Sequence, residues 1–324
     1  MIKKLYTVMS QGTDPYENLA LEELLLSKAT EDCCILYLWQ NHRTVVIGRN
    51  QNPWAECRTA VLQEEGGHLA RRLSGGGAVY HDLGNLNFTF LCTDDHYDLN
   101  KQLSVIQNAA ALAGVTATFS GRNDLLAEGA KFSGNAFYHS KGKAYHHGTI
   151  LVDVDFSKLE RYLSPPKVKL ESKGIASVRS RVVNLKTLSP TLTCQTMKDY
   201  MVTAFSQVYG HSVTPLTLTE EDNRLLQTLA QKYRSEEWLF GKPMPFTCSL
   251  EGRLSFGCLQ LQLQVESGVI RDLQVYTDAM DFSLSEGIKA ALQGCTFQAE
   301  AMIAALSCTA YAQEFAAFIH QQDI

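Results

Sequence analysis

The chain has 324 residues, of which 45% are hydrophobic and 19% are charged, so it can bury a full core and is long enough for two domains. Its net charge of -5 argues against general nucleic-acid binding, for which a basic surface supplies most of the affinity. No apolar run approaches the roughly 20 residues that cross a bilayer, and the first residues lack a signal-peptide core. We therefore predict a cytoplasmic protein without membrane contact.

The cysteines do not show the pattern of a disulfide-bonded framework. There are nine of them, an odd number, and none belongs to a Cys-x-x-Cys pair. A long chain with an odd count and no ligand spacing predicts reduced thiols and no cysteine-based metal site.

The first helix is well signalled at residues 15–28. Asp14 can cap it, Pro15 suits the first helical position, and Glu17 can complete a capping box. Apolar segments at 35–39 and 44–47 then read as strands joined by a polar turn, and a helix begins after Asn52-Pro53.

Strands and helices then follow one another without regular alternation, which favours an α+β fold with a mixed sheet over a doubly wound parallel sheet. The strands are predicted near residues 69–73, 78–81, 85–91, 116–120, 131–138 and 144–154, and the helices near 99–113, 157–163, 195–209 and 220–233.

A boundary is indicated at residues 240–245, where Gly241, Pro243 and Pro245 interrupt the helical pattern. We predict one domain over residues 1–245 and a smaller one over 246–324. The second would hold strands at 254–265 and 269–276, followed by helices at 284–292 and 298–318.

Three consecutive glycines, Gly75 to Gly77, follow Arg71 and Arg72 directly after a predicted strand. Residues without Cβ let backbone N–H groups approach an anion closely, and arginine neutralises phosphate charge. The segment lacks a Gly-Lys-Ser/Thr ending, Tyr80 stands where a dinucleotide fingerprint has its third glycine, and a strand follows instead of a helix. The run predicts a phosphate loop on a sheet; the alternative is a glycine-rich hairpin with two solvated arginines.

Three further polar clusters lie in strand-rich surroundings, at residues 121–124, 131–135 and 146–149. Each has an ordinary explanation when taken alone: Asp124 can form a turn, Lys131 can be solvated, and His147 can satisfy a backbone group. Taken together, they indicate a site.

In chain order these segments resemble the signature of the lipoate-protein ligases. The matching stretches are TVVIGRNQNPW from Thr44, RRLSGGGAVYHDLGN from Arg71, GRNDL from Gly121, KFSGNA from Lys131, HHGT from His146 and GIASVRSR from Gly174. The resemblance covers the first 245 residues, and the rest resembles the accessory domain of the bacterial long-form ligases. It implies an α+β fold: a mixed β-sheet catalytic domain of the biotin/lipoate ligase type with a small α+β C-terminal accessory domain.

The resemblance also implies a two-step activity. Lipoate attacks the α-phosphate of ATP, with Mg2+ present, and a lysine of a lipoyl domain then takes the lipoyl group from lipoyl-AMP. The expected partners are the lipoyl domains of 2-oxoacid dehydrogenase acyltransferase subunits and the glycine cleavage H protein, and the expected state is a monomer.

Residue roles follow from the same resemblance. Lys131 is expected to be catalytic, since one long cation can reach both the carbonyl oxygen and the α-phosphate. Asp124 is a candidate magnesium ligand, His81 and His147 are expected near the polar end of the lipoyl tunnel, and the basic segment 167–181 either closes on the adenylate or is a solvated surface. The nucleotide-binding set is Arg72, Gly75, Gly76, Gly77, Ala78, Val79, Tyr80 and Lys131; the lipoate-binding set is Arg71, Ser74, His81, Lys131, Ser133, Gly134 and His147.

Several alternatives share the fold. One is a lipoyltransferase that uses only preformed lipoyl-AMP. Another is an acyl-carrier-dependent octanoyltransferase, which needs a cysteine thiolate that the matching segments around Gly75, Lys131 and His147 do not contain. A non-catalytic lipoyl-domain binder and a biotin ligase fit less well, the latter because its glycine loop is organised differently. Selection between lipoate and octanoate is left open, because an apolar pocket discriminates such changes by only about 1–3 kcal/mol.

Overall fold

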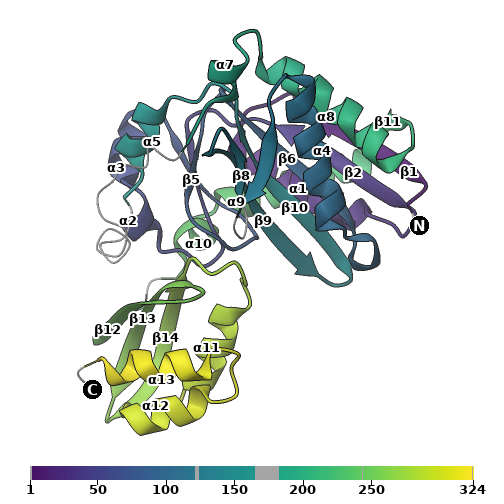
Figure 1. The fold of residues 1–324 in the computed structure, drawn as a ribbon. Helices are drawn as coiled ribbons and strands as arrows, with labels where there is room; N and C mark the ends of the chain where they lie inside the picture. Colours follow the sequence, from purple (N-terminus) through teal and green to yellow (C-terminus); the bar gives the residue numbers. More distant parts are fainter. Residues whose placement is uncertain (1, 121–123, 165–181, 243, 323) are drawn as a thin grey trace.

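The computed structural model describes residues 2–120, 124–164, 182–242, 244–322 and 324. Its largest element is an eight-stranded mixed sheet in which β1 runs parallel to both β2 and β11, and the other pairs are antiparallel (Figure 1). This confirms the predicted α+β class. In sheet order the strands are β11 (Val213–Pro215), β1 (Lys4–Met9), β2 (Cys33–Trp39), β6 (Asn85–Thr93), β10 (Lys143–Leu151), β9 (Ala130–Ser140), β8 (Asp124–Ala127) and β7 (Ala117–Ser120).

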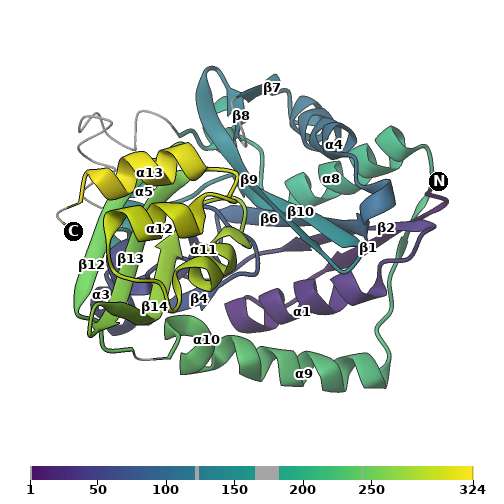
Figure 2. The ribbon, with the colours of Figure 1, turned by 90° about the horizontal axis from the view of Figure 1, so that it is seen from below.

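Helices cover both faces of this sheet. As Figure 2 shows, α1 (Pro15–Lys28) and α9 (Glu220–Arg234) lie on one face, and α4 (Leu99–Leu112) and α8 (Cys194–Tyr209) lie on the other. Asp14 caps α1 as predicted, accepting hydrogen bonds from the N–H groups of Tyr16 and Glu17. Each helical layer buries its own apolar cluster against the sheet, so the central strands β2 and β6 are buried on both sides.

A second, three-stranded sheet carries the glycine run. Its strands are β4 (His68–Arg71), β3 (Thr44–Ile47) and β5 (Val79–His81), with β3 parallel to β4 and antiparallel to β5. The glycines form the connection from β4 to β5, so the loop lies on a sheet, as the sequence predicts. Short helices accompany this part: α2 (Pro53–Glu56), α3 (Thr59–Glu64) and α5 (Phe156–Tyr162), with η1 (Asp94–His96) and α7 (Leu185–Leu188) elsewhere in the main body.

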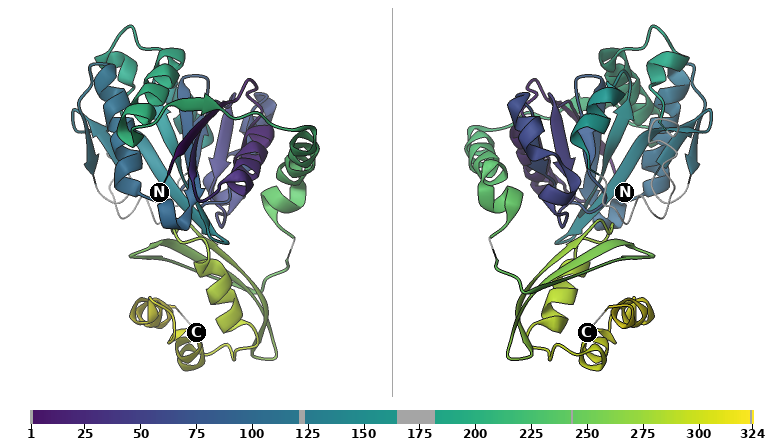
Figure 3. Two further views of the ribbon diagram at one scale, coloured as in Figure 1. Left: turned by 90° about the vertical axis from the view of Figure 1, so that its right-hand side faces the viewer. Right: turned by 90° about the vertical axis from the view of Figure 1, so that its left-hand side faces the viewer.

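The C-terminal domain has a core of its own. Its antiparallel sheet of β12 (Cys248–Leu254), β13 (Gly257–Glu266) and β14 (Val269–Thr277) packs against α11 (Leu284–Leu292), α12 (Ala299–Leu306) and α13 (Ala312–His320). The single helix predicted at 298–318 is wrong, because the chain breaks between α12 and α13. Figure 3 shows this domain below the main sheet, joined to it after α10 (Glu236–Phe240).

The structure also bears on the cysteines and on membrane-spanning segments. All nine cysteines carry free thiols. Within the described residues, no helix is both long enough and apolar enough to cross a membrane.

Candidate active site

A cavity of about 180 Å³ opens where the glycine loop faces the large sheet. Nine of the predicted site residues line it, and they come from the loop, β5, β9 and β10: Arg72, Gly76, Gly77, Ala78, Val79, His81, Lys131, Gly134 and His147. The remaining walls are Leu19, Trp39, Val46, Asn87, Asn135, Ala136, Gly148, Thr149 and, from the C-terminal domain, Met280.

The register of the strands shows that the cavity extends across the sheet from Lys131 on β9 to Trp39 on β2. Trp39 on β2 pairs with Asn87 on β6, and Asn87 pairs with Thr149 on β10. The Thr149 hydroxyl accepts from the N–H of Gly134 on β9, and a Cβ on Gly134 would lie only 2.8 Å from Lys131 Nζ. Lys131 therefore lies over Gly134, and three strand spacings, about 14 Å, separate β9 from Trp39 on β2.

Lys131 forms an ion pair with Asp124 across neighbouring strands. Its Nζ lies 2.7 Å from the Asp124 Oδ1, and both side chains are about one-third exposed, at 34% and 35%. The pair places a cation and a carboxylate at the edge of the cavity, beside the loop.

Arg72 shapes the glycine loop from inside. The buried guanidinium donates to Ser74 Oγ at 3.0 Å and to the carbonyls of Gly75 and Gly77 at 2.7 and 2.8 Å. Burial lowers the pKa of Arg72 to about 10, which still leaves it charged at neutral pH. The carbonyl oxygens of Gly75 and Gly77 accept hydrogen bonds from the Arg72 guanidinium, so they point towards this cation and do not repel an anion bound at the loop.

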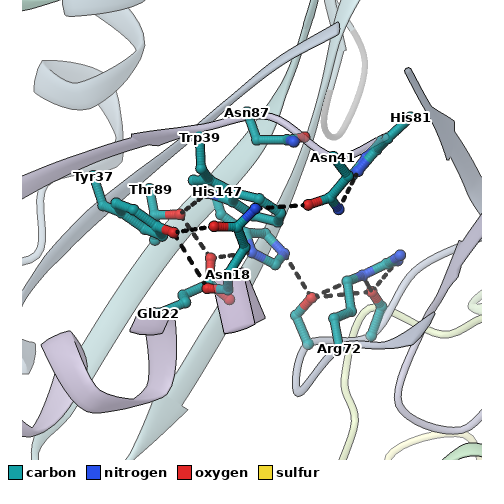
Figure 4. Close-up of polar contacts among 12 residues, drawn as sticks. Asn18, Glu22, Tyr37, Trp39, Asn41, Arg72, His81, Asn87, Thr89 and His147 are labelled. Carbon is teal, nitrogen blue, oxygen red and sulfur yellow. Dashed lines mark hydrogen bonds and ion pairs between the residues drawn. The ribbon is translucent and has the colours of Figure 1, made fainter. Parts of the chain in front are cut away.

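His147 links the loop to helix α1 (Figure 4). Its Nε2 lies 2.8 Å from Ser74 Oγ, and its Nδ1 lies 2.8 Å from Oε1 of the buried Glu22, which also accepts from Thr89. The order of groups is that of a serine–histidine–carboxylate triad. Ser74, however, is fully buried and accepts from Arg72, so the chain holds His147 and Arg72 in place rather than exposing a nucleophile.

His81 belongs to a second buried chain of contacts. Its Nδ1 lies 3.2 Å from Asn41 Nδ2, and Asn41 in turn accepts from Asn18 on α1 (Figure 4). Burial, followed by the positive charge of Arg72, lowers the pKa of His81 to about 3, so the imidazole is neutral. Sequence reasoning missed Asn18, Glu22 and Asn41, because polar residues in a capped helix and a turn are ordinary there.

Four predicted residues lie outside the cavity wall. Ser74 contacts it only through His147 and Arg72, Tyr80 packs on Tyr162 with ring centroids 5.5 Å apart, and Ser133 is buried with no partner for its Oγ in the described part of the chain. Gly75 faces the C-terminal domain. Their roles stay predictions.

Arg71 also lies outside, and the hydrogen-bond acceptors of its guanidinium are all main-chain carbonyls. The buried guanidinium donates to five carbonyls, those of Gly48, Arg49, Gln51, Trp238 and Leu239. It therefore ties β4 to α10 and to the loop after β3. It lines a different cavity, of about 530 Å³, at the junction with the C-terminal domain.

The C-terminal domain touches the glycine loop directly. The N–H of Gly76 donates to the Ala279 carbonyl at 3.1 Å, and a Cβ on Gly75 would meet that same oxygen at 2.3 Å. Asn50 adds two bonds, accepting from the N–H of Thr277 at 2.9 Å and donating to the Phe282 carbonyl at 2.6 Å. With Met280 in the cavity wall, the segment 279–282 forms part of the site's surroundings.

Two predicted features lie outside the described residues. They are residues 121–123 of the Gly-Arg-Asn-Asp motif and the basic segment 167–181 with the motif that follows Gly174.

Comparisons with known proteins match this geometry. Residues 14–206 match the lipoyl protein ligase A/B catalytic domain, and residues 244–324 match the bacterial lipoate protein ligase C-terminus. The chain is 39% identical over 312 residues to lipoate-protein ligase A of Bdellovibrio bacteriovorus, covering 94% of this chain and 92% of the relative. The chain belongs to the lipoate-protein ligase family.

Solved lipoate ligases share the fold. P. falciparum LipL1, in complex with lipoate, superposes with a TM-score of 0.84 at 28% identity, over 98% of this chain and all of that one. A lipoate-protein ligase A bound with ATP gives a TM-score of 0.65 at 27% identity, over 74% of this chain and 99% of that one. The family predicted from the motifs is confirmed.

Proposed function

We propose that this lipoate-protein ligase family member activates lipoate with ATP to give lipoyl-AMP and then transfers the lipoyl group to a lysine of a lipoyl domain. The observation that carries the proposal is the shared cavity, which is lined by Lys131, by Gly76 and Gly77 of the glycine loop, and by Trp39. Relatives solved with lipoate and with ATP support both substrates.

In the first step, a lipoate carboxylate oxygen bonds to the α-phosphorus of ATP, and the bond to the bridging oxygen breaks to release pyrophosphate. Negative charge grows on the phosphoryl oxygens. We propose that Lys131 and loop N–H groups other than that of Gly76, which donates to Ala279, are the donors to that charge. Preorganised donors of this kind contribute most to lowering such a barrier.

In the second step, the acceptor lysine amine bonds to the lipoyl carbonyl carbon, the carbonyl–phosphate bond breaks, and AMP leaves as the amine loses its proton. The carbonyl oxygen carries negative charge in this transition state. Lys131 at the cavity edge is placed to stabilise it, so one cation serves both steps.

We propose that Mg2+ accompanies ATP, with Asp124 as its protein ligand. Among the described residues no group of three or more His, Cys, Asp or Glu side chains could hold a metal alone. A single carboxylate fits magnesium only when phosphate oxygens and water complete its shell, which is the usual arrangement at nucleotide sites. The ion would neutralise phosphate charge; binding and orientation of lipoate would rest on the chain's own residues.

The finer assignments are also proposals. We infer domains over residues 1–245 and 246–324, supported by a C-terminal core drawn only from residues after 247. We propose a monomer that acts on the lipoyl domains of 2-oxoacid dehydrogenase acyltransferase subunits and on the glycine cleavage H protein. An archaeal bipartite ligase from Thermoplasma acidophilum, 28% identical with a TM-score of 0.66 over 76% of this chain and all of that one, was described with its E2 lipoyl domain.

The test is lipoate-dependent pyrophosphate release from ATP by the full chain, with a lipoyl domain added in a second reaction. Lys131→Ala should lower the rate of release by about 10²–10³. Lys186→Ala, which removes a surface lysine paired with Asp153, should leave it unchanged. Lack of release by the wild type, together with transfer from synthetic lipoyl-AMP, would overturn the proposal in favour of a lipoyltransferase.

A further inference from the structure

The amide orientations of Asn18 and Asn41, behind His81, follow from their hydrogen-bond partners. Asn18 Nδ2 lies 2.9 Å from the main-chain carbonyl of Gln40, which can only accept, so this atom is the amide nitrogen. This nitrogen also lies 3.5 Å from the Gly12 carbonyl and 3.0 Å from an amide atom of Asn41. Two donor nitrogens at 3.0 Å would repel each other, so the Asn41 atom is the acceptor Oδ1. The Asn18 oxygen accepts from the hydroxyls of Tyr37 and Ser10, at 3.0 and 2.6 Å.

This chain determines which His81 nitrogen carries the proton. Since Asn41 Oδ1 accepts from Asn18, its Nδ2 is the donor to His81 Nδ1 at 3.2 Å. Nδ1 is therefore unprotonated, and in the neutral imidazole the hydrogen lies on Nε2. Burial keeps the pKa of His81 near 3, so the ring does not take a second proton at neutral pH.

Within the described residues neither His81 Nε2 nor Asn87 Nδ2 has a hydrogen-bond acceptor, and both residues line the cavity. The side-chain amides of Asn85 and Asn87 bond to each other at 2.9 Å, and the Asn85 oxygen also lacks a partner among the described residues, so this pair does not fix which Asn87 atom is the donor. An unpaired buried donor costs about 1–3 kcal/mol, so the His81 Nε2–H group beside a substrate cavity indicates an acceptor on the substrate.

The position of His81 relative to Lys131 identifies which end of the substrate lies near the Nε2–H donor. His81 lies edge-on to Trp39, with ring centroids 6.0 Å apart, and Asn87 pairs directly with Trp39 across the sheet. Lys131 lies on β9, about three strand spacings or 14 Å away. A chain whose carboxyl group meets Lys131 thus brings its far end to Trp39, and in lipoate that end is a cyclic disulfide.

We propose that Asn18 and Asn41 are positioning residues that hold His81 as an Nε2–H donor to a dithiolane sulfur, and so favour lipoate over octanoate. The inference rests on the proposed function. It moves His81 from the polar end of the tunnel, where the sequence analysis expected it, to the far end. Sulfur is a weak acceptor, but octanoate offers none and leaves the donor unpaired, and a site built to hydrogen-bond rejects the analogue that lacks the group.

The tautomer is tested by ¹⁵N NMR of the imidazole nitrogens in the ligand-free full chain. We expect His81 Nδ1 to resonate as unprotonated and Nε2 as protonated, without titration near neutral pH. Asn41→Leu removes the donor to Nδ1 and should give a tautomer mixture. Gln102→Leu is the matched control, because Gln102 is a buried amide 3.1 Å from His146 on the other sheet face. A protonated Nδ1 in the wild type overturns the proposal.

Selectivity is tested by the ratio of kcat/KM for lipoate to that for octanoate in pyrophosphate release. Loss of one neutral hydrogen bond predicts a fall of about tenfold in this ratio for His81→Leu and Asn41→Leu. His81→Gln, whose amide can donate near the Nε2 position, should recover part of it, and Gln102→Leu should leave it unchanged. Equal losses of kcat/KM for both substrates in His81→Leu would overturn the sulfur assignment. If the wild type released no pyrophosphate with either substrate, the proposed function would be refuted, and the NMR result on the tautomer would still stand.

Discussion

Lys131 Nζ lies 2.7 Å from the Asp124 carboxylate, so the proposed catalytic cation pairs with the residue proposed to bind magnesium. Binding ATP would give both groups new partners at once: phosphate for the lysine and a metal ion for the carboxylate. The pair thereby keeps each charge compensated before the substrates arrive.

Lys131→Ala should lower the rate of pyrophosphate release by about 10²–10³, the usual cost of removing one fixed donor to a developing anion. Asp124→Asn should keep more activity but require more Mg2+, which a magnesium titration of the release rate would measure. Asp153→Asn, at a surface aspartate paired with Lys186, is the control. An unchanged magnesium requirement in Asp124→Asn would contradict the assignment of Asp124 as a metal ligand.

Gly75→Ala should separate the C-terminal domain from the glycine loop. The new Cβ would lie 2.3 Å from the Ala279 carbonyl oxygen and 2.6 Å from that of Met280, and main-chain atoms cannot move aside alone. Limited proteolysis after α10 and small-angle scattering would detect the separation. Gly77→Ala serves as control for the domain contact, since no atom lies within 4 Å of its new Cβ. Equal proteolysis rates in wild type and Gly75→Ala would show that the contact is not maintained in solution.

Arg71→Met should destabilise the protein rather than weaken lipoate binding. It leaves five main-chain carbonyls without their charged donor, and breaking a buried charged network costs about 3–5 kcal/mol. Urea unfolding measures the loss, with Arg58→Met, an exposed arginine bonded to Ser164 and to the Arg161 carbonyl, as comparison. A raised KM for lipoate with unchanged stability would instead support the lipoate-binding role predicted from the sequence.

Acid should destabilise the fold through His81. Its pKa is lowered from 6.5 to about 3 by burial, so above pH 6.5 the residue is neutral in both folded and unfolded states and contributes nothing. As pH falls from 6.5 towards 3, only the unfolded chain takes the proton, and stability decreases by up to about 1.4 kcal/mol per pH unit.

The check on this pH effect is the free energy of unfolding measured between pH 7 and 4. His81→Leu should show a shallower decline than wild type, and His211→Leu, at an exposed position, should follow the wild type. Superimposable curves for His81→Leu and wild type would show that the residue does not stay neutral in the fold.

Short sequence patterns predicted those structural features that depend on residues close together in the chain. The cap at Asp14, the end of α1 at Lys28 and the loop character of Gly75 are examples. The strand expected to reach residue 73 ends at Arg71. The chain turns there, and the Arg72 side chain donates a hydrogen bond to the Gly75 carbonyl of the loop. No local signal could pair β6 with both β2 and β10, since strand order depends on contacts between segments remote in sequence.

The same limit applies to the site. Lys131, His81 and His147 were found because they lie in motifs, whereas Asn18, Glu22 and Asn41 act through contacts that span from 22 to 125 positions along the chain. Their side chains carry ordinary polar groups, and only burial against the sheet gives them a role.

Several contacts between the C-terminal domain and the catalytic half are made by main-chain atoms. Gly76 donates its amide to the carbonyl of Ala279, Thr277 donates its amide to Asn50, and the Asn50 side chain ends on the carbonyl of Phe282. Most side chains of segment 277–282 can therefore change without removing these bonds, provided the backbone path is kept. These main-chain bonds depend on the path of the chain, whereas the Asn52–Gln260 bond and the ring contact of Tyr138 with Phe282 depend on residue identity. Relatives can therefore differ at most positions of segment 277–282 and keep the main-chain part of this contact, while a change at Asn52 or Tyr138 would remove a side-chain part of it.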